Sequence, residues 1–166
     1  MSLSSSFLGE FEHEMANTRK TLERVPTDKL AWQPHAKSMT LGRLASHISE
    51  MPVWAVRNIQ MPEYDFATGG LLRTDLPSTQ EIVEAFDKNV AAARDAISGA
   101  SDEVLRENWT LRRGDRVVFA MPRLAVLRSM VLNHTIHHRG QLTVYLRLQD
   151  VPLPGLYGPS ADEGLM

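Results

Sequence analysis

Apolar residues recur at intervals of three and four along four stretches of the chain, which is the period of an α-helix with one buried face. The predicted helices cover about residues 5–24, 41–60, 79–98 and 122–149. The connections 25–39 and 61–77 are long, so the helices they join can be parallel as well as antiparallel neighbours.

Local signals support these boundaries. Thr40 is placed to cap the second helix, and Ser78 with Glu81 forms a capping box at the start of the third. Pro52 lies inside the second helix, where its missing amide predicts a kink. Pro122 suits the first turn of the last helix.

Strand-like patterns are sparse. Residues 109–119 resemble a small hairpin with Gly114 in its turn, and residues 61–77 are typical of a long loop. The sequence therefore predicts a single domain over residues 1–166 with an all-α fold. We expect a four-helix bundle with a short hairpin-like connector before the last long helix.

Composition excludes several functions. The chain has 166 residues, a formal net charge of −2 and no cysteine. That charge argues against a nucleic-acid partner, and the lack of cysteine means that nitrogen and oxygen must hold any metal. A thiol in any reaction would come from a ligand. No apolar run reaches the ~18 residues of a membrane span, and no secretion signal is visible, so we expect no membrane partner and a cytoplasmic location.

Histidines interrupt two of the apolar stripes. His134 and His138 are four residues apart in the last predicted helix, so they point the same way. His47 lies on the apolar face of the second helix. Three imidazoles could share a divalent metal ion, with Zn²⁺ or Ni²⁺ favoured and Fe²⁺ or Mn²⁺ as alternatives. The other interpretation is that all three are core histidines with protein hydrogen-bond partners.

Neighbouring residues narrow the kind of site. His137 competes with His138 as a ligand, but His138 keeps to the apolar line, which leaves His137 or Arg139 for the rim, an outer contact or a partner subunit. Thr135 stands where a metalloprotease motif has glutamate. Glu50 lies off the His47 stripe, so a di-iron site is not indicated.

Four motifs together resemble the DinB family of damage-inducible proteins, in the DinB/YfiT-like superfamily of metalloenzymes. The similarity covers nearly the whole chain. The motifs are Trp32-x-Pro34 with Ser38-Met39, Leu44-x-x-His47-Ile48, His134-x-x-His137-His138-Arg139-Gly140-Gln141-Leu142, and Tyr157-Gly158-Pro159-Ser160-Ala161-Asp162-Glu163.

The resemblance implies a divalent metal held by His47, His134 and His138. It also implies helices in up-down-down-up order and a homodimer. Characterised relatives include mycothiol-dependent maleylpyruvate isomerase and bacillithiol transferases, in which the metal activates a small-molecule thiol. We therefore expect a metal-dependent enzyme that activates a small-molecule thiol or water, similar to a thiol S-transferase. The alternative is a non-catalytic metal- or ligand-binding protein of the stress response.

Overall fold

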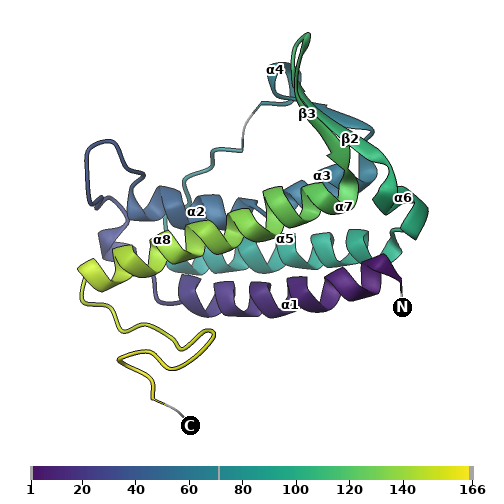
Figure 1. Cartoon of the computed structure of the whole chain (residues 1–166). Helices are drawn as coiled ribbons and strands as arrows, with labels where there is room; N and C mark the ends of the chain where they lie inside the picture. The colour runs from purple at the N-terminus through teal and green to yellow at the C-terminus, as the bar shows by residue number, and fades with distance from the viewer. Residues whose placement is uncertain (1, 71, 165–166) are drawn as a thin grey trace.

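Four long helical segments pack together in the computed structural model, which describes residues 2–70 and 72–164 (Figure 1). The first and last segments run in one direction and the two between them in the other. The segments are α1 (Leu3–Leu22), α2 (Leu41–Glu50) with α3 (Val53–Gln60), α5 (Thr79–Gly99), and α7 (Arg123–Val126) with η2 (Leu127–Asn133) and α8 (His134–Leu148). Shorter helices are η1 (Thr27–Lys29), α4 (Phe66–Gly69) and α6 (Asp102–Arg106).

The predicted helix starts are confirmed at two caps. The hydroxyl of Thr40 accepts the Arg43 amide at 3.1 Å, and that of Ser78 accepts the Glu81 amide at 3.2 Å. At Pro52 the helical ladder breaks more fully than the expected kink: α2 ends at Glu50 and α3 begins at Val53. The break follows from the amide that proline lacks.

The predicted all-α fold is wrong, because the chain also forms a three-stranded mixed sheet. The strands are β1 (Glu63–Asp65), β2 (Asn108–Arg113) and β3 (Arg116–Pro122), in the order β1-β2-β3. The hairpin of β2 and β3 was expected, but β1 arises in the predicted loop 61–77 and pairs parallel to β2. The fold is therefore α+β, not a pure four-helix bundle. A strand of three residues is too short to show alternation, and only its distant partner gives it hydrogen bonds.

Aromatic packing attaches the sheet to the helices. Tyr64 of β1 is buried and lies edge-on to Trp54 of α3, with ring centroids 5.0 Å apart. Arg57 stacks on both rings, 4.8 Å from Trp54 and 4.5 Å from Tyr64. Trp109 of β2, in the hairpin itself, is fully buried. These contacts hold β1 close to α3. Further along the chain, the Thr74 amide donates to Glu50 of α2.

The last long helix contains a π-helical segment, η2, directly before His134. A π turn accommodates an extra residue and so rotates everything that follows it. The buried residues of α8 are Thr135, His138, Arg139, Leu142 and Leu146. Helical spacing from His134 and His138 predicts Gln141 on the same face, but Gln141 is exposed.

Arg139, one of the two residues considered for the rim, an outer contact or a partner subunit, is buried. Its guanidinium donates to the Glu14 carboxylate at 2.6 Å, to the Glu14 carbonyl at 3.0 Å and to the Thr18 hydroxyl at 3.1 Å. Tyr157 donates to the same carboxylate at 2.7 Å and also contacts Arg139. This group ties α8 and the C-terminal segment to α1.

Within residues 2–70 and 72–164, no helix combines the length and apolar character that crossing a bilayer requires.

Replacing Arg139 with methionine should lower the free energy of unfolding by about 3–5 kcal/mol, because it leaves the Glu14 carboxylate buried and unpaired. Urea denaturation measures the change. The matched control is Arg147→Met, which removes an exposed ion pair to Asp162 in the C-terminal segment. It should cost below about 1 kcal/mol. Equal losses in the two variants would contradict the structural role given to Arg139.

Candidate metal centre

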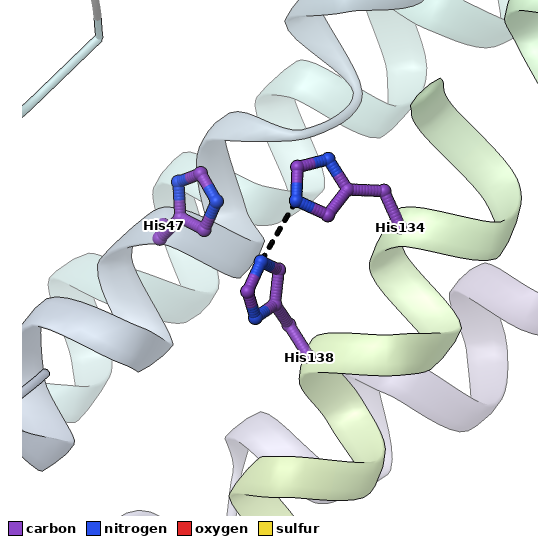
Figure 2. Close-up of side chains that lie close together, drawn as sticks. All are labelled: His47, His134 and His138. Atoms are coloured by element: carbon purple, nitrogen blue, oxygen red, sulfur yellow. Dashed lines mark hydrogen bonds between the residues drawn. The ribbon is translucent and has the colours of Figure 1, made fainter. Parts of the chain in front are cut away.

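The structure brings His47, His134 and His138 together between α2 and α8. Figure 2 shows the ring of His47 approaching from α2 and the other two rings from α8. The ring centroids lie 5.4 Å apart for His47 and His134, 4.7 Å for His47 and His138, and 4.6 Å for His134 and His138. One nitrogen from each ring lies within 4.8 Å of the others, so the group could hold a metal ion.

Hydrogen bonds orient the two rings on α8. Nδ1 of His138 lies 2.7 Å from the amide oxygen of Gln141. Since that oxygen can only accept, the ring proton is on Nδ1 and the lone pair is on Nε2. Burial lowers the pKa of His134, and the backbone of Met130 opposes this with a smaller effect that raises it. The His138 ring has an acceptor for its Nδ1 proton, as metal-bound imidazoles usually do.

The two Nε2 atoms that remain face each other at 2.8 Å (Figure 2). Without a cation, the His134 ring can carry its proton on Nε2 and donate it to the Nε2 lone pair of His138. A divalent ion between the rings would take the place of that proton and accept a lone pair from each nitrogen. The donor atoms thus fit a metal ion that accepts neutral nitrogen ligands.

A buried carboxylate supports His47 from the other side. Oε2 of Glu50 lies 3.6 Å from Nδ1 of His47 and accepts a hydrogen bond from the Arg43 guanidinium at 2.5 Å. Oε1 of Glu50 accepts a hydrogen bond from the Thr74 amide at 2.8 Å. Burial by itself would raise the pKa of Glu50, but the contacts with His47, Thr74 and Arg43 together hold it below its usual value. Glu50 is therefore ionised, which favours a ring proton on Nδ1 of His47.

His134 and His138 are neutral at physiological pH. Burial lowers the pKa of His138 to about 4, against an opposing effect of the Gln141 hydrogen bond, and His134 and His47 add to the lowering. Burial also lowers the pKa of His134, with His47 acting in the same direction. A metal ion competes with protons for imidazole, so neutral rings are ready to bind one.

The neighbours of the three histidines lie outside the group. His137 is exposed and its ring centroid is 5.0 Å from that of His138. Thr135 is buried, and its hydroxyl donates to the Val131 carbonyl at 2.7 Å. No acid–base group stands at that position, in agreement with the exclusion of a metalloprotease motif.

Sequence reasoning missed two supporting residues, Glu50 and Gln141. Both follow a histidine at a spacing of three, in His47-x-x-Glu50 and His138-x-x-Gln141. Helical residues three apart are neighbours on the surface, so this spacing was a usable signal. Glu50 was considered only as a ligand of a di-iron site, and its contact with the His47 ring was not predicted.

A cavity of about 340 Å³ adjoins the group on the side of His47. Its other lining residues are Met39, Arg43, Leu72 and Arg73. His47, the member of the group that lines the cavity, is therefore accessible to a small molecule.

Comparison with known proteins gives a consistent result. The family model described as "DinB family" matches residues 1–164. The uncharacterized protein YrdA of Bacillus subtilis (strain 168) is 29% identical over 161 residues, which cover 95% of this chain and 89% of that protein.

Two solved structures share the fold. A DinB-like protein from Bacillus cereus superposes with a TM-score of 0.70 at 25% identity, covering 92% of this chain and 97% of that one. The DinB-like protein YjoA from Bacillus subtilis gives a TM-score of 0.69 at 18% identity, covering 97% and 99%. Because the family model spans nearly every residue, including all three histidines, the chain belongs to the DinB family.

Proposed function

We propose that His47, His134 and His138 bind a divalent metal ion and that the chain is a metal-dependent enzyme. The observation that carries the proposal is the pair of Nε2 atoms of His134 and His138, which lie 2.8 Å apart on rings that burial keeps neutral. His47 completes a set of three nitrogen donors.

The donor set favours Zn²⁺ or Ni²⁺, with Fe²⁺ or Mn²⁺ as alternatives. Three neutral imidazoles bind any of these ions and leave at least one coordination position for a small molecule. Zinc–nitrogen bonds of about 2.0–2.1 Å would require the His134 and His138 rings to separate slightly. Both rings lie at the boundary of the core, where such a movement is small and local.

The reaction we propose is activation of a small-molecule thiol or of water. A divalent ion with an open position lowers the pKa of a bound thiol or water. The chain has no cysteine, so the thiol would belong to a substrate. Glu50 and Gln141 hold the ligand rings in place, and the cavity beside His47 gives the substrate access.

The alternative is a non-catalytic protein that binds a metal or ligand during stress. The cavity favours an enzyme, because a structural metal site is normally closed by its protein ligands and their neighbours. A thermal-shift screen of metals crossed with thiols and electrophiles, followed by turnover assays, separates the two. Metal binding without turnover of any thiol–electrophile pair would favour the non-catalytic function.

Changing His134 to alanine should abolish most metal binding, because two donors cannot replace three at this site. The purified wild-type protein should carry about one divalent ion per chain by mass spectrometry. The matched control is His137→Ala, which removes an exposed imidazole three residues away and should leave metal content unchanged. Loss of metal in both variants, or in neither, would contradict the ligand assignment.

Changing Gln141 to leucine should weaken metal binding about tenfold, because the His138 ring loses the acceptor that orients it. Competition with a chromophoric chelator measures the affinity. Gln149→Leu, at the end of the same helix, serves as the control. If Gln141→Leu binds metal as tightly as the wild type, the acceptor does not orient the ring as proposed.

The metal-free protein should lose stability as the pH falls from about 6.5 to about 4. His138 has a pKa of about 4 when folded, against 6.5 ordinarily, so within this window only the unfolded chain binds the proton. The loss is complete once the pH is below both values. Urea midpoints measured across the window test this, with His138→Gln expected to give a flatter curve. Parallel curves for the two proteins would count against a buried neutral His138.

A further inference from the structure

The lining of the cavity beside His47 indicates what kind of molecule the cavity can hold. Its volume of about 340 Å³ lies at the lower end of the ~300–1,000 Å³ found for small-molecule sites. His47 belongs both to its lining and to the histidine group. A molecule in the cavity can therefore place one end at the metal and the rest against the other lining residues.

One part of the cavity lining is apolar. Met39 is 40% exposed, and Leu72, which also lines the cavity, is half-buried. Methionine is flexible and polarisable, so it adapts to ligands of different shape. An apolar portion of a ligand would cover these two side chains and remove them from water.

The two arginines of the cavity differ in what they already bind. Arg43 contacts the Glu50 carboxylate at 2.5 Å, the Asp75 carboxylate at 3.0 Å and the Thr74 carbonyl at 2.9 Å. Its charge is compensated, so it serves as part of the wall. Arg73 is exposed and forms no ion pair with any residue in the described part of the chain. Its planar guanidinium is suited to an acidic group such as a carboxylate.

The segment that carries Leu72 and Arg73 is attached to α2. The Thr74 amide donates to Glu50 at 2.8 Å, and the Leu76 amide donates to the Ser46 hydroxyl at 3.1 Å. Glu50 thus contacts both the wall of the cavity and the ring of His47. The wall stands in a defined place before any ligand arrives, which lowers the entropic cost of binding.

We infer that this cavity is the substrate site and that the substrate is a small molecule with an apolar portion and a carboxylate. The carboxylate pairs with Arg73, the apolar portion packs on Met39 and Leu72, and the reactive end reaches the metal beside His47. This assignment rests on the proposed function, because the reactive end needs the metal.

The test uses 6-mercaptohexanoate and its uncharged amide as probes on the full chain loaded with Co²⁺. Thiolate binding to the metal is followed by its charge-transfer absorption. Both probes offer the same thiol, so the ratio of their dissociation constants isolates the carboxylate. The wild type should bind the acid about tenfold more tightly than the amide, as a charge-assisted hydrogen bond provides.

In Arg73→Gln the preference for the acid should disappear, while binding of the amide should be unchanged. The matched control is Arg116→Gln, an exposed arginine on the hairpin, which should keep the preference. Equal binding of acid and amide by the wild type would overturn the assignment, as would a preference that survives in Arg73→Gln.

Metal content, measured on the same samples, separates this inference from the proposed function. A chain that binds no metal contradicts the proposed function and this inference with it, whereas a metal-loaded chain without the preference contradicts the inference alone.

Discussion

The packing of α2 against α8 is the contact on which the candidate site depends, because it places His47 opposite His134 and His138. Two consecutive residues set the rotation of α8. His138 faces α2 and the histidine group, whereas Arg139 faces α1 and its buried carboxylate partner Glu14. A rotation of α8 that moved one of these side chains out of place would also displace the other. The buried ion pair on one side of the helix therefore positions the imidazoles on the other.

Much of the fold and of the site follows from the sequence, for identifiable reasons. The long helices were predicted because each carries an apolar stripe over several turns, and Thr40 and Ser78 marked two of their starts. The three histidines were found because spacing in a helix fixes direction. The sheet was missed because β1 has three residues and depends on pairing with β2, far along the chain. The π-helical segment was missed because it depends on hydrogen bonds that residue types do not reveal. It lies directly before His134 and rotates the helical positions that follow it.

The parts of the site combine into one arrangement. Gln141 accepts the Nδ1 proton of His138 on α8, and Glu50 lies beside the His47 ring on α2. Glu50 also accepts the Thr74 amide, which belongs to the segment forming the cavity wall. One carboxylate thus contacts both the His47 ring and the segment that forms the cavity wall.

The central claim is that these three imidazoles hold a divalent ion, and anomalous X-ray diffraction at the absorption edge of the bound metal tests it most directly. Crystals grown from protein purified without chelators should show one anomalous peak between α2 and α8. It should lie about 2.0–2.1 Å from a nitrogen of each of His47, His134 and His138 if the ion is zinc. A peak elsewhere, or no peak after soaking with Zn²⁺ and Ni²⁺, would contradict the claim.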